Sequence, residues 1–567
     1  MIEVMARYLS PGTWILGISP IATVLVLMVA LRWGGAKAGA VAWLWAALVS
    51  LTCFGGDVTT LASGTAKGLW ETLFILLIVW GAMSVYGLID GMGGFPVITS
   101  TFNRVTGGDR LLQILIIGMV FPAWMQGVLG FGTPVAVTAP LLIGLGFDPI
   151  LAVTIPLLGH SWTVTFGSLG SSYWTLQRMT GLAEKPLALW SAVYFVPMCV
   201  MMFFFGAFWY SKLVYGDPWR EVKRGWFPWL SLGVIQGMAI FLFSAYVFPS
   251  IGGFMAGFVG LAWGSLIRKF PFYRVEVSDQ TVAAQAGTGP AVTAPATKEG
   301  QKPASRQLTF GQAFLPYVVI IVLVLAIYLS PLLQPVLGTP NIRAILEQNQ
   351  FQLGPAWPQT KTALGFVNAK AAKYSPLRIF TMPGSIIWGS LIISVAIYTI
   401  AGLFKPQVWK KIGERLIKAA IPASLTLIPL SMMSVVMMEH GITTLLAVGT
   451  AKATGALYPF FANYIGQLGA FMTGSNTASN ILFGAFQRDT ALVLGITPFL
   501  VAGAQTVGGA IGNIHCPMNI TLGTGSAGIP GREGEVMSRT LTTGAIIGLV
   551  TGVLSLVLVS MFPRAGL

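Results

Sequence analysis

Two stretches of the sequence combine helix-breaking residues with hydroxyl and amide groups, which can hold an anion without a formal cation. The first reads Gly-Phe-Gly-Thr-Pro over 130–134, and the second reads Thr-Gly-Ser-Asn-Thr over 473–477. A break between two helices leaves unpaired backbone N–H groups that carry partial positive charge. Such helix ends bind anions. Each stretch therefore predicts an anion-binding turn between two short helices.

The two stretches occupy corresponding places in two halves of the chain. An offset of 342 residues, without a gap, places Gly132 on Gly474 and Thr133 on Ser475. Interrupted segments in corresponding positions of two halves indicate a transporter's binding site. The alternative is that small residues serve only close helix packing. The residues expected to bind substrate are Gly132, Thr133, Pro134, Gly167, Gly170, Gly474, Ser475, Asn476, Thr477, Asn480, Gln505, Gly509 and Gly512.

Several ionisable residues fall within or beside apolar segments, where a charge is costly and suggests function. His160 and His515 are candidates for proton coupling because a histidine changes charge near neutral pH. Each has an alternative role, in which its ring simply hydrogen-bonds a backbone carbonyl. Glu71 is a third candidate. Its alternative role is structural: it would lie in the first turn of a span that begins near residue 67, where a carboxylate interacts favourably with the helix dipole. Glu439 and His440 are expected at a span end, at the membrane interface.

The composition predicts the elements that must position these groups. Of the residues, 55% are hydrophobic and only 9% are charged, against about 25% charged in soluble domains. Uncharged runs such as 186–211, 226–267 and 540–563 exceed the roughly 20 residues that a membrane helix needs. Continuous apolar runs disfavour a β-barrel, whose strands alternate. The sequence therefore predicts an all-α polytopic membrane protein with about 12 to 14 transmembrane helices.

Basic residues and composition suggest how the chain is organised. Excess Lys and Arg beside the spans, which gives the net charge of +15, predicts topology and not a nucleic-acid partner. We expect an N-terminal repeat over 1–270 with a hairpin at about 122–147, and a C-terminal repeat over 310–567 with a hairpin at about 458–488. Residues 271–309 would form a flexible cytoplasmic linker. The N-terminus and the hydrophilic stretch 333–381 would lie outside.

The sequence offers little for catalysis, metals or cofactors. The cysteines, Cys53, Cys199 and Cys516, are far apart and have no metal-binding spacing. No Walker motif is present, so ATP hydrolysis by this chain is not expected. A membrane enzyme would need a clustered nucleophile and base or metal ligands, and no such motif appears. We therefore expect no cofactor, no metal and no enzyme activity, and keep an integral-membrane enzyme as a distant alternative.

Three runs resemble the bacterial lactate permease family: GFGTPVAVTAPLLIGLGF from Gly130, FMTGSNTASNILFGAFQ from Phe471 and AGAQTVGGAIGNIHCPMNI from Ala502. The resemblance covers nearly the whole chain in span order. It implies a carrier of L-lactate, D-lactate or glycolate, usually coupled to protons, within a wider ion-transporter superfamily. It further implies two inverted repeats, each with a re-entrant hairpin whose Ser-Asn-Thr tip holds the substrate carboxylate. Ser475-Asn476-Thr477 matches that tip, and Thr133-Pro134 matches it only in part.

The resemblance also implies an elevator movement of a hairpin-bearing transport domain against a dimeric scaffold. Together these features predict a secondary transporter that carries a small 2-hydroxy monocarboxylate with H⁺ across the bacterial inner membrane. Its partners would be the small organic anion, the co-transported H⁺, the lipid bilayer and a second copy of the chain. Two alternatives keep the fold: a different small anion, or coupling to Na⁺ through the Ser475–Thr477 tip.

Overall fold

The computed structural model describes residues 2–31, 33–94, 97, 108–128, 133–270, 273, 308–328, 330 and 340–564. Almost all of this part of the chain is helical, and eleven of its helices are long and apolar enough to cross a membrane. Helices pair their backbone groups internally, as a bilayer requires. The chain is therefore a polytopic helical membrane protein, as predicted. Four strands of two residues each are the exception to the predicted all-α fold.

The elements of the first half are α1 (Ile2–Arg7), α2 (Pro11–Leu25), η1 (Val26–Ala30), α3 (Gly35–Cys53), α4 (Val58–Gly91), α6 (Arg110–Leu112), η2 (Gln113–Val120), α7 (Phe121–Val128), α8 (Thr133–Gly144), α9 (Pro149–Ser161), η3 (Ser168–Gly170), α10 (Ser171–Thr180), α11 (Glu184–Tyr215), α12 (Arg220–Arg224), α13 (Trp226–Leu242), η4 (Phe243–Val247) and α14 (Pro249–Ile267).

The elements of the second half are α16 (Phe310–Tyr328), α18 (Ile342–Leu346), η5 (Asn349–Phe351), β1 (Gln352–Leu353), β2 (Thr360–Lys361), β3 (Val367–Asn368), β4 (Leu377–Arg378), α19 (Pro383–Ile400), α20 (Gln407–Arg415), η6 (Leu416–Ala420), α21 (Ile421–Glu439), α22 (Ile442–Thr454), η7 (Gly455–Leu457), α23 (Tyr458–Thr473), α24 (Asn476–Val493), α25 (Pro498–Gly512), α26 (Pro517–Ser526) and α27 (Glu533–Met561).

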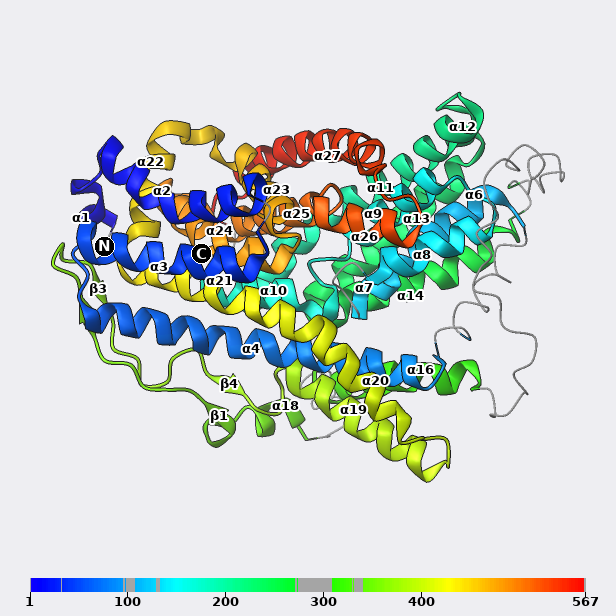
Figure 1. Cartoon of the computed structure of the whole chain (residues 1–567), viewed down its shortest axis with the longest axis horizontal. Helices are drawn as coiled ribbons and strands as arrows, with labels where there is room; N and C mark the ends of the chain where they lie inside the picture. Colours follow the sequence, from blue (N-terminus) through cyan, green and yellow to red (C-terminus); the bar gives the residue numbers. More distant parts are fainter. Residues whose placement is uncertain are drawn as a thin grey trace.

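The same unit, a helical hairpin followed by a broken helix, occurs once in each half of the chain. In the first half it consists of α7 and α8 followed by α9 and α10, and in the second of α23 and α24 followed by α25 and α26. The two units pack together in the middle of the molecule (Figure 1). The second hairpin turns at Gly474, whose φ is +70°. Of the turn predicted at 130–134, residues 130–132 lie outside the described residues, and Thr133 and Pro134 begin α8.

The two units correspond with a change of register after the hairpins. Gly146 and Gly495 both have positive φ, and Pro149 and Pro498 both begin the helix that follows. Proline suits this first position because its missing N–H would have no helical partner. The spacing there is 349 residues, instead of the 342 that aligns the tips. The difference is located in the second hairpin arm, because α24 has 18 residues and α8 has 12.

Glycines let the second hairpin and its broken helix approach closely. A Cβ on Gly508 of α25 would overlap the carbonyl of Asn463 in α23. A Cβ on Gly512 would overlap the carbonyl of Gln467, one helical turn further along α23. Small residues at helix contacts are a common basis of packing in membranes. The glycines therefore fix the distance between the two helices that position the second tip.

Helix α4 packs along α21 on the side away from α3, and it contacts η3 and α10 of the first unit (Figure 1). It is crossed by a segment that we call the strap, residues 340–381. Within the strap, β1 pairs with β4 and β2 with β3, both antiparallel. Its residues bond to the helices beneath: Trp70 Nε1 donates to the Ser375 carbonyl at 3.1 Å, and Asn368 Nδ2 donates to the Glu439 carbonyl at 2.8 Å. The strap is therefore an integral part of this face.

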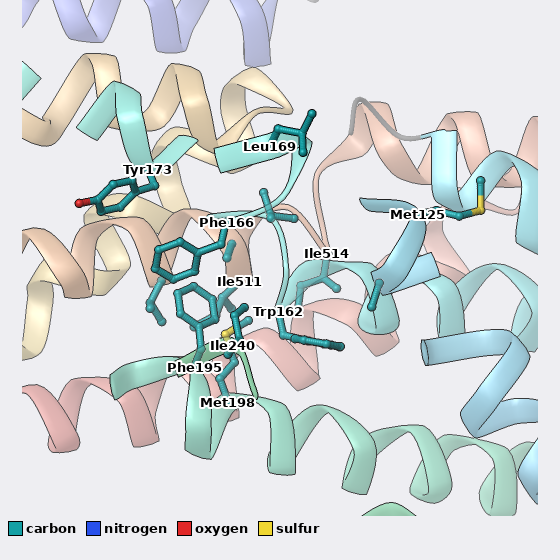
Figure 2. Packing of buried hydrophobic residues seen from close by; sticks show 14 of the residues in the cluster. Met125, Trp162, Phe166, Leu169, Tyr173, Phe195, Met198, Ile240, Ile511 and Ile514 are labelled. Carbon is teal, nitrogen blue, oxygen red and sulfur yellow. The ribbon is translucent and has the colours of Figure 1, made fainter. Parts of the chain in front are cut away.

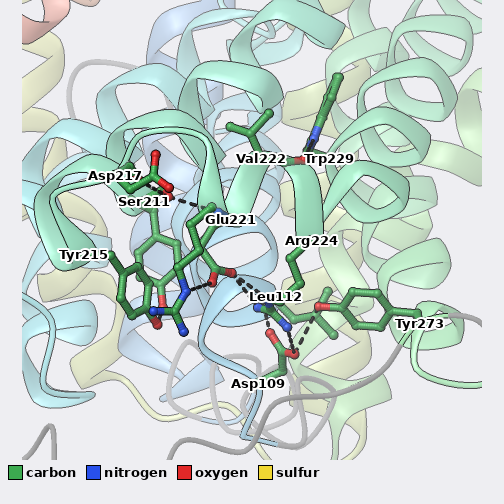
Figure 3. A network of polar contacts seen from close by, with 12 residues as sticks. Asp109, Leu112, Ser211, Tyr215, Asp217, Glu221, Val222, Arg224, Trp229 and Tyr273 are labelled. Atoms are coloured by element: carbon green, nitrogen blue, oxygen red, sulfur yellow. Dashed lines mark hydrogen bonds and ion pairs between the residues drawn. The ribbon is translucent and has the colours of Figure 1, made fainter.

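A network of polar side chains lies around α6 and α12, at the end of the molecule away from the N-terminus (Figures 1 and 3). The buried carboxylate of Asp109 caps α6 and accepts a hydrogen bond from the Tyr273 hydroxyl at 3.0 Å. Arg224 pairs with Asp109 at 3.3 Å and with Glu221 at 2.6 Å. These bonds fix the start of the chain that follows α14. Of the linker predicted at 271–309, only Tyr273, Leu308 and Thr309 are among the described residues.

Candidate functional site

A small cavity lies where the second hairpin tip meets the first broken helix. Its volume is about 30 Å³. Residues of the tip and of the segment between α9 and α10 form most of its wall, together with α7 and the segment after α25. The lining residues are Gln126, His160, Val164, Ser168, Ser171, Ser172, Gly474, Ser475, Asn476, Thr477 and Asn513.

The second hairpin tip presents a helix N-terminus to this cavity. Ser475 precedes α24, and its hydroxyl accepts a hydrogen bond from the backbone N–H of Ala478 at 3.3 Å. Gly474 reverses the chain with a positive φ that an L side chain rarely adopts. Its Cβ would also lie 2.5 Å from the Met518 side chain. Local sequence chemistry therefore forms the turn, and close packing against α26 holds it.

Two asparagines bind the tip to both broken helices. Asn476 Nδ2 donates to the hydroxyls of Thr165, at 3.0 Å, and Thr506, at 3.2 Å. Asn480 Nδ2 donates to the Thr506 hydroxyl at 3.0 Å and to the Ser172 carbonyl at 2.9 Å. The two threonine hydroxyls are themselves 3.0 Å apart. All the amide protons of both asparagines are thus used within the protein, which fixes the tip in place.

The first broken helix supplies a second N-terminus at the same cavity. Three consecutive residues, Ser168, Leu169 and Gly170, have positive φ, which strains the first two. The strain redirects the chain so that α10 begins at Ser171. The hydroxyl of Ser172 lies 2.9 Å from that of Thr477, which joins the two helix starts. Apolar packing supports this segment: Figure 2 shows Phe166 and Phe195 together, with ring centroids 5.8 Å apart.

The cavity has a polar lining without a fixed charge. Of its described lining residues, only His160 is titratable within the usual pH range, and none is Lys, Arg, Asp or Glu. The N-termini of α24 and α10 each contribute partial positive charge, equivalent to about half a unit. Hydroxyl and amide groups surround them. The arrangement can hold one small anion through partial charges, and can release it because no full ion pair must break.

Only some of the predicted substrate-binding residues line the cavity. Gly474, Ser475, Asn476 and Thr477 line the cavity. Gly132 lies outside the described residues, as does the side chain of Thr133. The others belong to the described chain but do not line the cavity, and several set its packing or hydrogen bonds. They are Pro134, Gly167, Gly170, Asn480, Gln505, Gly509 and Gly512.

The residues that do not line the cavity have identifiable contacts. Gln505 accepts a hydrogen bond from Gln487 Nε2 at 2.8 Å and donates to the Ser479 hydroxyl at 3.0 Å, inside the second hairpin. A Cβ on Gly167 would lie 2.6 Å from the carbonyl of Gln126. A Cβ on Gly509 would overlap the Asn476 amide oxygen. These residues position the lining without touching the cavity.

The two histidine candidates occupy different surroundings. His160 lines the cavity, and its Nδ1 lies 2.9 Å from the Pro156 carbonyl. His515 does not line the cavity. Its ring packs against that of Phe471, with centroids 5.8 Å apart, and a Cβ on Gly544 would lie 2.7 Å from its Nδ1. Of the two, only His160 can meet a bound anion directly.

Glu71 lies far from the start of its helix, so the alternative of a first-turn role is wrong. Helix α4 begins at Val58 and is capped by Asp57, whose carboxylate accepts the N–H of Thr60 at 2.7 Å. Glu71 is buried in the middle of α4 and faces Arg178 of α10 at 4.0 Å. The Arg178 guanidinium also lies over the Phe74 ring, 4.1 Å from its centroid. Glu71 therefore lies where α4 meets the site-bearing helices.

The Glu439–His440 pair lies at the end of α21, as predicted, and is largely covered by other parts of the protein. Glu439 Oε2 lies 2.7 Å from Lys67 Nζ, with side-chain exposures of 12% and 4%. The ring of His440 is fully buried, and its Nδ1 lies 2.7 Å from the Val436 carbonyl. The strap covers this end of α21 through Asn368, so the pair packs against protein, and its placement at the membrane interface stays a prediction.

Several residues of the site were not foreseen from the sequence. They are Gln126, Val164, Thr165, Ser168, Ser171, Ser172, Thr506 and Asn513. The run Gly-Ser-Leu-Gly-Ser-Ser over 167–172 held a usable signal, because it places hydroxyl groups beside helix-breaking glycines inside an apolar segment. No comparable signal marked Gln126 or Val164.

Comparison with known proteins places the chain in a family. A family model described as L-lactate permease matches residues 13–562. The glycolate permease GlcA of Escherichia coli (strain K12) is 28% identical, over 96% of this chain and 95% of that protein. The L-lactate permease of Bacillus subtilis (strain 168) is 26% identical, over 85% of this chain and 84% of that one.

The fold has a counterpart among solved structures. The crystal structure of the Alcanivorax borkumensis YdaH transporter superposes with a TM-score of 0.50 at 16% identity, covering 93% of this chain and 99% of that one. At this identity the likeness shows the fold alone. The candidate spans and the match of the family model over nearly the whole chain show that this multi-pass inner-membrane protein belongs to the L-lactate permease family.

Proposed function

We propose that this protein is a secondary transporter of a small 2-hydroxy monocarboxylate, such as lactate or glycolate, moved together with H⁺. The observation that carries the proposal is the neutral polar cavity onto which the N-termini of α24 and α10 converge. Helix ends of this kind favour an anion. The names of the relatives, glycolate permease and L-lactate permease, support the same class of substrate. They favour a transporter over an enzyme.

The proposed movement is that of an elevator with re-entrant hairpins. In this proposal the hairpins and broken helices travel as one body, because Asn476 and Asn480 bond the second tip to both broken helices. The body would move against α4 and α21. Glu71 and Arg178 face each other at 4.0 Å across part of that boundary.

Purified protein in liposomes should accumulate radiolabelled lactate or glycolate when the outside is more acidic than the inside. The physical reason is that a proton moving down its gradient with the anion makes accumulation favourable. The measurement is the label retained on filters, with a protonophore as control. Uptake that ignores the proton gradient but follows a Na⁺ gradient would overturn the coupling to H⁺.

Na⁺ remains a second candidate for the coupled ion, and one observation favours it. The Oδ1 atoms of Asn476 and Asn480 are buried and accept no hydrogen bond from the described residues. Carbonyl-type oxygens are ligands that hard cations prefer. The Na⁺ arm of the liposome experiment distinguishes the two ions.

His160→Asn should change the pH dependence of uptake, whereas His515→Asn should leave it as in the wild type. His160 lines the cavity and His515 packs behind it, so only the first can exchange a proton beside the substrate. Initial uptake rates would be measured from pH 5 to pH 8 at fixed gradient. A wild-type pH profile in His160→Asn, with folded protein, would remove His160 from proton coupling.

A further inference from the structure

The cavity has a single side chain made of hydrocarbon alone among its described lining residues. This side chain is Val164, which is 5% exposed. The other lining side chains carry hydroxyl, amide or imidazole groups, and Gly474 has none. A bound 2-hydroxy acid directs its carboxylate and hydroxyl toward groups that can hydrogen-bond them, because burying either without a partner is costly. The substituent on its second carbon is then left to face Val164.

Val164 is held in place from both sides. The hydroxyl of Thr163 donates to the His160 carbonyl at 2.8 Å and to the Ala123 carbonyl of α7 at 3.2 Å. The hydroxyl of Thr165 lies 3.0 Å from that of Thr506 and accepts a hydrogen bond from Asn476. The backbone that carries Val164 is therefore bonded to the first hairpin on one side and to α25 on the other.

Apolar packing prevents the same segment from withdrawing. The side chain of Trp162 is fully buried, with its ring 6.4 Å from that of Phe203. Phe166 packs against Tyr173, with ring centroids 5.5 Å apart (Figure 2). Interiors packed in this way transmit a change of one methylene group, because few voids can absorb it. Val164 thus forms a rigid wall of the cavity.

The space in front of that wall is small. A water molecule needs roughly 10–15 Å³ of such volume, so the cavity of about 30 Å³ has the room of two or three waters. Room this small favours the smallest 2-hydroxy acids over longer ones. A second carboxylate would find no Lys or Arg among the described lining residues.

We propose that Val164 is a specificity-determining residue that sets the longest substituent on the second carbon of the transported acid. The proposal rests on the proposed function and deepens it. Hydrogen accompanies the second carbon in glycolate and a methyl group does so in lactate, and Val164 accommodates both. An ethyl or propyl group meets the Val164 methyl groups, and the fixed backbone leaves it no room.

The test is competition against radiolabelled glycolate in proteoliposomes, with unlabelled lactate, 2-hydroxybutyrate and 2-hydroxypentanoate as competitors. In the wild type, 2-hydroxybutyrate should compete at least about 10-fold less potently than lactate, because one methylene provides about this discrimination in a tight pocket. Val164→Ala should move this fall to a longer acid. Val164→Ile should weaken lactate about 10-fold relative to glycolate.

Val501→Ala is the matched control, because Val501 is a buried valine of α25 that does not line the cavity. It should keep the wild-type order of competitors. Either Val164 variant alone decides the question if the other does not fold. If the folded variants take up glycolate and keep the wild-type order of competitors, the proposed role of Val164 is wrong and the proposed function still stands. Wild-type protein that takes up neither glycolate nor lactate would overturn the proposed function, and this inference with it.

Discussion

Gly509→Ala should lower substrate uptake about 100-fold, the loss expected when a contact group is displaced by about 1 Å. A Cβ at this position would overlap the amide oxygen of Asn476. Asn476 would then move away from Thr165 and Thr506, and the hairpin tip would lose its link to both broken helices. Initial uptake rates in proteoliposomes, normalised to the amount of folded protein, would measure the loss.

Gly525→Ala provides the matched control for this prediction. Gly525 lies in α26, and a Cβ there would meet no atom within 4 Å. The same substitution should therefore leave uptake unchanged and stabilise the helix by about 0.5–1 kcal/mol. Transport by Gly509→Ala at the wild-type rate would show that the position of Asn476 does not matter to the site.

Lys67→Met should reduce the free energy of unfolding by about 3–5 kcal/mol, the cost of leaving a buried charge without its partner. The Lys67 ammonium and the Glu439 carboxylate are 2.7 Å apart and almost fully buried. The ammonium also lies 5.1 Å from the centroid of the Tyr374 ring in the strap. Chemical denaturation of the purified protein in detergent would measure the change.

The double variant Lys67→Met/Glu439→Gln should recover most of that loss, because replacing both members of a buried ion pair is often nearly neutral. Lys411→Met is the control for an exposed pair. Lys411 faces Glu414 at 4.0 Å, and both side chains are substantially exposed, so its removal should cost less than about 1 kcal/mol. A single Lys67→Met variant as stable as the wild type would contradict the structural role of the buried pair.

The sequence predicted the parts of the fold that depend on local composition. Long uncharged runs predicted the membrane helices, and a Gly-Ser-Asn-Thr run inside an apolar segment predicted the turn at Gly474. The offset of 342 residues also predicted that Pro156 corresponds to Pro498, which is wrong, because Pro149 is the residue that begins the matching helix. Beyond the hairpin tips the longer second arm shifts the correspondence, as the paired Gly146 and Gly495 turns and the paired Pro149 and Pro498 helix starts show.

Features that depend on packing were beyond sequence reasoning. The sequence predicts a span that begins near Lys67, with Glu71 in its first turn, whereas α4 begins at Val58 with Asp57 as its cap. Val164 is one valine among many in apolar sequence, and only the fold shows that it faces the cavity. The position of Gln126 in the cavity could be predicted only by knowing which side of α7 faces the site. The strap contacts likewise have no periodic pattern that would indicate their targets.

The uncharged lining of the cavity has an electrical consequence for the transport cycle. With His160 neutral, the occupied site carries only the charge of what it holds, and the empty site carries none. A monoanion crossing alone would work for or against the membrane potential by about 2.3 kcal/mol for each 100 mV. If one monovalent cation accompanies each anion, the occupied site has no net charge and this electrical work disappears. The movements of the occupied site and of the empty site are then both independent of voltage. The lining thus leaves the sensitivity of transport to voltage to the co-transported ion alone, and a substrate-evoked current in a clamped bilayer would report it.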